Sequence, residues 1–381
     1  MSQITPSNYS SPEISQNVLE RPEQDVKAVS PSPFCFTLTP TRWILWIAGL
    51  GGLAFLVLLG CLRFGTESID FFRMVAILFE GMRLGGEERN VADPTSTILL
   101  QIRLPRVVLA FMVGGSLAAV GVVLQALLRN PLADPYVIGV SSGAALGAAI
   151  AMLFGLSISV LSVSAIPFCA FLGASFSLFI VYRIALIYGG FSIHTLLLAG
   201  VVLNAIFSAF IMFLTTLADP NRAFGMYAWL MGSLTGPDGT TLSILSVYLF
   251  AGILLMATQS HSLNLLTLGE ESARSLGVEV ERVKKMLFVA AALVTGAVVA
   301  FSGLIGFVGL IVPHAVRLVV GADHRLLLPA SGIVGGMFLM IADMVARTIL
   351  SPAEIPVGVV TALVGGPIFL MLLVQRRGRL L

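Results

Sequence analysis

The residues that could bind a partner fall into a few short charged groups. Arg103 and Arg106 stand three apart in the sequence RLPR, just before a long apolar run, and Arg347 follows Asp343 by four residues in a later run. Residues three or four apart share one face of a helix, so each pair can act on one side. Anchoring at a membrane interface and docking of a partner explain the arginines equally well. For Asp343 we expect an ion pair with Arg347.

A second group has the sequence GEESARSLG over residues 269–277. Its members of interest are Gly269, Glu270, Glu271, Ala273, Arg274, Leu276 and Gly277. The two glutamates precede Arg274 at helical spacing, which predicts ion pairs along a short helix that is bounded by the two glycines. Ala273 and Leu276 would give this helix a small apolar face. Taken alone, the residues favour an ordinary solvated surface helix.

Asn130, Pro131 and Leu132 follow a long apolar run. An Asn-Pro pair is a typical helix stop, because proline cannot continue the hydrogen-bonding pattern and restricts the residue before it. The sequence therefore predicts a turn here, between two apolar helices.

The sequence lacks the parts of familiar catalytic sites. Lysine occurs only at 27, 284 and 285 and never follows glycine, so no P-loop can bind ATP. The four histidines lie far apart without an HExxH motif, no GxSxG elbow is present, and the three cysteines form no CxxC pair. We therefore expect no enzyme activity, no bound metal and no cofactor, which leaves transport, channel or receptor functions.

The elements that position these groups must lie in a membrane. Hydrophobic residues make up 57% of the chain and charged residues only 11%, against roughly 25% charged in soluble domains. The net charge of +2 is too small and too dispersed for a nucleic-acid partner. The chain is therefore predicted to be an all-α polytopic membrane protein in which each span takes about 20 residues.

Apolar intervals with little or no charge divide the chain into about ten transmembrane helices in one bundle. They are predicted at 43–62, 107–128, two within 135–182 divided near Pro167, 184–218, 240–259, 286–306, 308–320, 327–349 and 356–375. Residues 1–40, with six prolines and seven serines, are predicted to be a disordered cytoplasmic tail, and residues 41–381 the transmembrane domain. The polar loop 260–285 lies outside the membrane. With both termini in the cytoplasm, most of the 22 lysines and arginines fall on the cytoplasmic side, as the positive-inside rule requires.

Several long blocks carry a resemblance to a known family. They are QIRLPRVVLAFMVGGSLAAVGVVLQALLRNPLADPYVIGVSSGAALG at 101–147, LLLAG at 196–200, LNLLTLGEESARSLG at 263–277, SGLIGFVGLIVPHAVRLVVGADHRLLLP at 302–329 and ADMVARTILSPAEIPVGVVTALVGGPIF at 342–369. Together they resemble the permease subunits of ABC importers for iron chelates, haem and vitamin B12. The likeness runs from about residue 43 to the end, and the first 40 residues have no counterpart in it.

The resemblance implies a multi-pass permease of the cytoplasmic (inner) membrane, working as a homodimer or with a similar subunit. Its partners would be two ATP-binding subunits, which use the ATP, and one extracytoplasmic substrate-binding protein. A ferric siderophore is the expected cargo, with haem or cobalamin as alternatives. A remote alternative is an ion-coupled secondary transporter, for which Asp343 is the candidate intramembrane carboxylate.

The resemblance also assigns roles to the three groups. Arg103, Arg106 and Arg347 would dock acidic residues of the binding protein. Residues 269–277 would form the coupling helix that rests on the ATP-binding subunit. Asn130 and Leu132 would narrow the cytoplasmic exit of the pathway as a gate.

Overall fold

The structure is a computed structural model that describes residues 38–65, 69–83, 94–156, 159–160, 163–187 and 192–377. The predicted disordered tail lies outside the described residues up to residue 37. The compact unit that carries the helices begins at Leu38.

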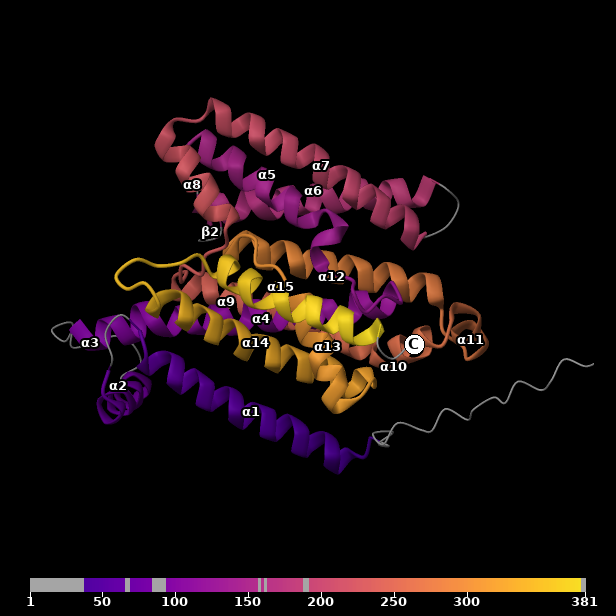
Figure 1. Cartoon of the computed structure of the whole chain (residues 1–381), viewed down its shortest axis with the longest axis horizontal. Coiled ribbons are helices and arrows are strands. Elements are labelled where there is room, and N and C mark those ends of the chain that lie inside the picture. Colours follow the sequence, from indigo (N-terminus) through magenta and orange to yellow (C-terminus); the bar gives the residue numbers. More distant parts are fainter. Residues whose placement is uncertain are drawn as a thin grey trace, which may run out of the picture. The chain divides into compact units, whose positions relative to one another are not determined.

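Apolar helices dominate this unit (Figure 1). The long ones are α1 Pro40–Arg63, α4 Leu104–Leu127, α6 Ala165–Ile187, α7 Ile193–Leu217, α9 Gly239–Thr258, α12 Val280–Ser302 and α14 His324–Thr348, joined by α5 Val140–Leu153, α13 Val308–Val320 and α15 Val357–Arg377. Within the described residues, seven helices are long and apolar enough to cross a membrane. Three shorter apolar helices, α5, α13 and α15, occupy the positions of the remaining expected segments. The chain is thus a multi-helix membrane protein, and the count of ten spans stays a prediction.

Shorter elements join these helices. They are α2 Phe71–Arg83, α3 Pro94–Thr97, the π-helix η1 Ile98–Arg103, the 3-10 helix η2 Pro135–Ile138, α8 Pro220–Leu230, α10 Ser260–Thr267, α11 Glu270–Ser275, and the strands β1 Ser159–Val160 and β2 Val163–Ser164. The two strands pair antiparallel, with Ser159 opposite Ser164, a small departure from the expected all-helical fold.

The predicted break near Pro167 is confirmed to within a few residues. The helix α5 ends at Leu153 and α6 begins at Ala165, so Pro167 lies in the first turn of α6. A proline is tolerated there because the first helical N–H groups have no partner within the helix. The proline therefore marks a helix start.

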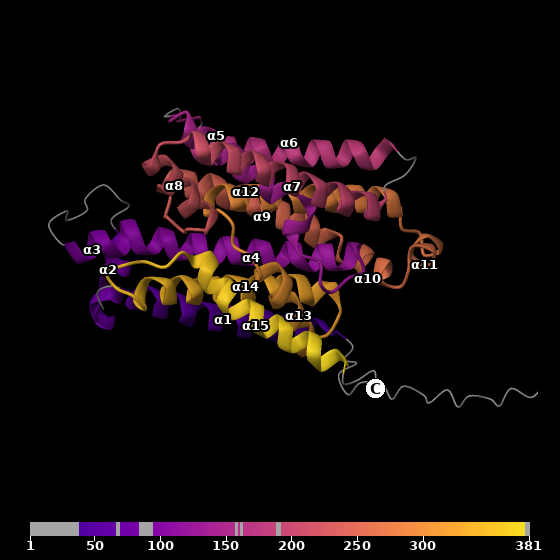
Figure 2. The ribbon, with the colours of Figure 1, turned by 45° about the horizontal axis from the view of Figure 1, so that its top comes forward.

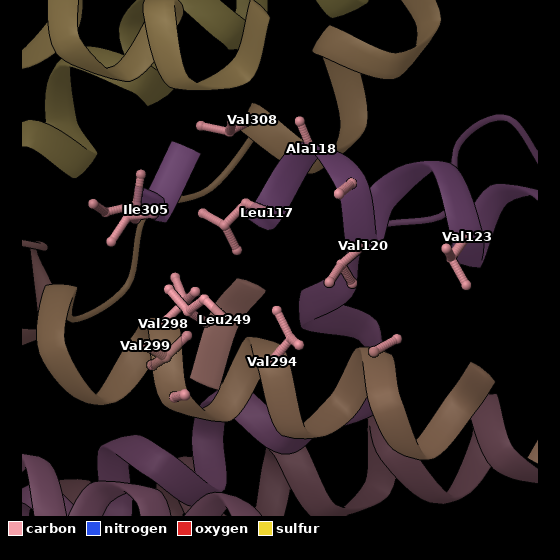
Figure 3. Packing of buried hydrophobic residues seen from close by; sticks show 14 of the residues in the cluster. Leu117, Ala118, Val120, Val123, Leu249, Val294, Val298, Val299, Ile305 and Val308 are labelled. Carbon is pink, nitrogen blue, oxygen red and sulfur yellow. The ribbon is translucent and has the colours of Figure 1, made fainter. Parts of the chain in front are cut away.

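The centre of the bundle is α4, with α12, α13 and α14 packed around it (Figures 1 and 2). The most apolar stretch of Pro94–Leu127, the segment that contains α4, is 83% buried. The corresponding stretch of α1 is only 11% buried, so α1 lies on the outside of the bundle. Figure 3 shows buried side chains of α4, α9 and α12, among them Val120, Leu249 and Val298, that belong to one apolar cluster. The helices α5, α6 and α7 form a second group that packs on this centre through α12.

Glycines set the distance between α4 and its neighbours. A Cβ atom built on Gly121 would lie 1.9 Å from the carbonyl oxygen of Gly309 in α13, and one on Gly114 would lie 2.2 Å from that of Gly335 in α14. Small residues let helix backbones approach where lipid offers no hydrophobic drive for association. These close contacts hold α4 at the centre of the bundle, and the charged residues lie at its two ends.

Replacing Gly121 with alanine is expected to destabilise the folded protein by about 1–3 kcal/mol, because the added methyl group cannot avoid the backbone of α13. The measurement is the thermal unfolding midpoint of the purified protein in detergent. Gly51→Ala in α1 is the matched control, since nothing lies within 4 Å of the Cβ position there. Equal midpoints for the two variants would contradict this account of the α4–α13 contact.

Two of the short helices begin inside the bundle. The segment before α5 and the segment before α13 meet where the backbone N–H of Ile305 donates to the hydroxyl of Tyr136 at 2.6 Å. Gly139 (φ 82°) and Phe307 (φ 71°) turn the chain at these two starts in the left-handed region. The turn after α4 is thereby tied to the centre of the bundle.

Candidate functional site

The bundle has two ends with different chemistry. One, called here the α2 end, carries α2, α3 and α8; the other, the α11 end, carries α10 and α11 (Figures 1 and 2). The three predicted docking arginines lie at the α2 end. The predicted coupling helix and gate turn lie together at the α11 end.

At the α2 end, Arg106 joins two acidic residues that are distant in sequence. Its Nε donates to Oδ1 of Asp343 at 3.0 Å, and its Nη1 lies 2.9 Å from Oε2 of Glu354. Arg347 pairs with the other oxygen of Asp343 at 3.0 Å, which confirms the predicted pair. Two arginines and two carboxylates therefore form one network, called here the rim network, across α4, α14 and the loop after α14.

Burial differs sharply within the rim network. The side chain of Asp343 is 0% exposed and that of Arg347 6%, whereas Glu354 is 49% exposed. A buried carboxylate needs compensating cations, and removing one of them costs about 3–5 kcal/mol. Arg347 therefore works inside the fold, whereas Glu354 and, to a smaller extent, Arg106 at 13% can be reached by solvent or a partner.

Arg103 is also held within the chain. Its Nη1 donates to the carbonyl oxygens of Leu62 at 3.2 Å and Arg63 at 3.4 Å, at the end of α1. The residue is 4% exposed. Carbonyl groups in the last turn of a helix lack partners within it, and a cation there is favourable. Arg103 thus fastens the end of α1 to the start of α4.

At the α11 end, α10 connects the loop to the start of α14. The side-chain amide of Asn264 donates to Oδ1 of Asp323 at 2.8 Å and its carbonyl oxygen accepts from the backbone N–H of His324 at 2.9 Å. Leu263 and Leu266 are buried on the inner face of α10. The helix α10 is therefore packed against the bundle and tied to the start of α14.

The predicted ion pairs within α11 are wrong. Instead of Arg274, Glu270 binds Lys284 of α12, whose Nζ donates to Oε1, and the same oxygen lies 3.8 Å from Nη2 of Arg129. Arg274 instead faces Glu281 at 3.9 Å. Lys284 and Arg129 lie across the fold, where local spacing gives no information about them. The hydrogen bond from Lys284, together with nearby positive charge, holds the pKa of Glu270 below its usual range.

The predicted apolar face of Ala273 and Leu276 is wrong as well. Ala273 is 0% exposed and packs inward, while Leu276 is 60% exposed. The helix ends at Ser275 and Gly277 has φ 85°, so Leu276 leaves the helical register and turns outward. Leu268, just before α11, is 67% exposed. The two exposed leucines place apolar surface on both sides of α11.

Asn130 and Leu132 lie in a turn directly beside α10. The Oδ1 atom of Asn130 accepts from the backbone N–H of Leu132 at 3.0 Å, and both residues are exposed. Nε of Arg129, the residue before them, donates to the carbonyl oxygen of Leu266 at 3.2 Å. The structure therefore brings the predicted coupling helix and the predicted gate turn together.

Three important residues were missed from the sequence. Glu354 lies in an ordinary polar loop and gives no signal. Lys284 could have been noticed, because it is one of only three lysines and stands at the edge of an apolar run. Arg129 is adjacent to the Asn-Pro turn, but only the fold shows that it reaches α10 and α11.

Two further surfaces bear on function. On α7 the polar residues His194, Ser208 and Thr216 are exposed among apolar ones. The hydroxyl of Thr216 donates to the carbonyl oxygen of Phe213 in the same helix at 2.7 Å. Exposed polar side chains on a span suit a water-filled path or a second protein better than lipid. In the described part of the chain, no group of three or more His, Cys, Asp or Glu side chains is placed to hold a metal ion.

Comparison with known proteins gives consistent results. Residues 50–375 match the FecCD transport family. The cobalamin import system permease of Halobacterium salinarum is 46% identical, over 77% of each chain. The hemin transport system permease of Yersinia pestis is 44% identical, over 74% of this chain and 84% of that one. A solved structure of an inward-facing metal-chelate type ABC transporter has a TM-score of 0.74 at 32% identity and covers 86% of this chain and 98% of its own.

Proposed function

Because the chain belongs to the FecCD transport family and is a permease subunit of an ABC importer, we propose that it carries an iron chelate, a ferric siderophore, into the cytoplasm. The observation that carries the proposal is the match of the family to residues 50–375. Haem and cobalamin are the alternative cargoes, as the names of the related permeases suggest.

The proposed assembly has two copies of this chain, two ATP-binding subunits and one extracytoplasmic binding protein in the inner membrane. The sequence has no P-loop, so the energy must come from a partner that binds ATP. Exposed polar residues on α7, Ser208 among them, support a pathway between the two copies, since they would otherwise face lipid. The chain itself would bind no cofactor.

In this assembly the α2 end faces outward and the α11 end faces the cytoplasm. Arg103, Arg106 and Arg347 belong to the proposed docking surface for the binding protein. Arg106 makes the direct charge contact, and the two buried arginines hold the surface in shape. Charge pairing at a rim sets the approach and orientation of a partner more than its affinity.

At the cytoplasmic end, closure of the ATP-binding subunits around ATP would open the transport pathway. Residues 269–277 rest on the ATP-binding subunit and move when the two subunits close. Asn130 and Leu132 form the gate that this motion opens. The contact of Arg129 with Glu270 of α11 at 3.8 Å supports the assignment, because it joins the residue before the gate turn to the segment 269–277.

The decisive experiment presents a panel of ferric siderophores, haem and cobalamin to the cognate binding protein. The assembly is reconstituted in proteoliposomes, and ATP hydrolysis and uptake are measured for each cargo. A ferric siderophore is expected to be retained and to stimulate hydrolysis. Stimulation by haem or cobalamin alone would replace the cargo assignment. Uptake that survives ATP depletion but collapses with an uncoupler would instead indicate a secondary transporter.

A further inference from the structure

We propose that Glu270 is the positioning residue that transmits the motion of α11 to the gate turn, acting through Arg129, while Lys284 anchors it to α12. The inference rests on the proposed function, since it takes α11 as the part that contacts the ATP-binding subunit. It concerns a step within this chain that the family assignment leaves open, namely how a shift of the loop reaches Asn130 and Leu132.

One carboxylate oxygen makes the connection. Oε1 of Glu270 accepts from Nζ of Lys284 and lies 3.8 Å from Nη2 of Arg129. Lys284 belongs to α12, and Arg129 lies two residues after the end of α4 at Leu127. A displacement of α11 by a partner therefore acts on two spanning segments at once. No other ion pair in the described part of the chain joins α11 to the end of α4.

Arg129 is placed to turn this displacement into a change of backbone. Its φ of 46° lies in the left-handed region, which residues with a side chain rarely adopt. Its guanidinium is held by Leu266 of α10 as well as by Glu270 of α11. Because Asn130 is the next residue, a displacement of the Arg129 side chain acts directly on the first residue of the gate turn.

Lys284 provides the fixed side of the connection. The residue is 4% exposed, and a buried ammonium group requires an anionic partner, which Glu270 supplies. Lys284 also borders an apolar pocket with Leu124 and Leu128 of the α4 end and Phe288 of α12. This pocket lies between the end of α4 and α12.

The test measures gate movement and ATP hydrolysis in the same sample. Cys35, Cys61 and Cys169 are replaced by alanine, Leu132→Cys carries a nitroxide, and the permease is assembled with its ATP-binding subunits in nanodiscs. Electron spin resonance gives the distance between the two labels without and with ATP, so no cargo is needed. In the otherwise unaltered protein, ATP is expected to change this distance.

In Arg129→Met, hydrolysis is expected to continue. In both Arg129→Met and Glu270→Gln, the ATP-dependent population change at the gate is expected to fall at least about fivefold, the lower range of coupling between sites. Arg129→Lys keeps the charge and is expected to recover part of the change. Glu279→Gln is the matched control, because its carboxylate faces Arg282 on the solvent side and lies outside 269–277.

The outcomes distinguish a failure of the role given to Glu270 from a failure of the proposed function. A full distance change in both Glu270→Gln and Arg129→Met would overturn the role of Glu270 and leave the transporter assignment intact. A wild-type assembly without hydrolysis or without any distance change would overturn the proposed function, and this step with it. If Glu270→Gln fails to assemble, Arg129→Met decides, since that side chain is 43% exposed and its replacement leaves the Glu270–Lys284 pair in place.

Discussion

Replacing Arg106 with glutamate is expected to abolish the stimulation of ATP hydrolysis by cargo-loaded binding protein. The substitution puts a third negative charge beside Asp343 and Glu354. Asp343 is fully buried, so the loss of one of its two cations also destabilises the fold, by about 3–5 kcal/mol. Stimulated hydrolysis in proteoliposomes and the thermal unfolding midpoint in detergent are measured on the same preparation.

Two further variants separate docking from folding. Glu354→Gln keeps the pair of Arg106 with Asp343 but frees one face of Arg106, so stability should be unchanged and the binding protein should associate faster. Arg347→Met removes a cation that is 6% exposed, so it should lower stability while leaving the contact surface in place. If Arg106→Glu assembles and is stimulated normally, the docking role of this residue is refuted.

Replacing both Leu268 and Leu276 with aspartate is expected to detach the ATP-binding subunits. These side chains are 67% and 60% exposed on a loop outside the apolar spans, and burying each against a partner would contribute about 1.5–3 kcal/mol. Their loss therefore weakens association by about tenfold or more per position. Copurification of the subunits and ATP hydrolysis by the complex are the measurements.

Thr267→Asp is the control for the added charge, because Thr267 is exposed next to Leu268 and offers no comparable apolar surface. Ala273→Arg tests a different property. Ala273 is 0% exposed, so a long charged side chain there should disrupt the packing of α11 itself and lower the unfolding midpoint. Retained association in the double aspartate variant would exclude the two leucines from the interface.

The sequence predicted most of the helices for a local physical reason. Inside a membrane each backbone polar group must be bonded within its own helix, so a span needs an uninterrupted apolar stretch and charges mark its ends. The predicted interval 43–62 corresponds to α1 at Pro40–Arg63, and 240–259 to α9 at Gly239–Thr258. The predicted break near Pro167 lies at 154–164, because proline is tolerated in the first turn of the helix that follows it.

The predicted ion pairs also succeed or fail according to whether the pairing depends on one helix or on several. Asp343 and Arg347 were paired correctly from their spacing, since both lie on one face of α14. The same rule failed for Glu270 and Arg274, because Lys284 and Arg129 compete for Glu270 from other helices. Helical spacing only makes a pair possible, and it carries no information about closer or better buried partners elsewhere in the fold.

The sequence by itself determined that this is a helical membrane protein without a P-loop, with its polar groups gathered in a few places, and its motif blocks indicated the family. Only the tertiary structure decided which groups act on one another. It joined Arg106 to Glu354 and Arg129 to Glu270, and it turned Ala273 inward and Leu276 outward. The physical reason is that apolar periodicity acts within a helix, whereas burial and charge pairing depend on how separate helices pack.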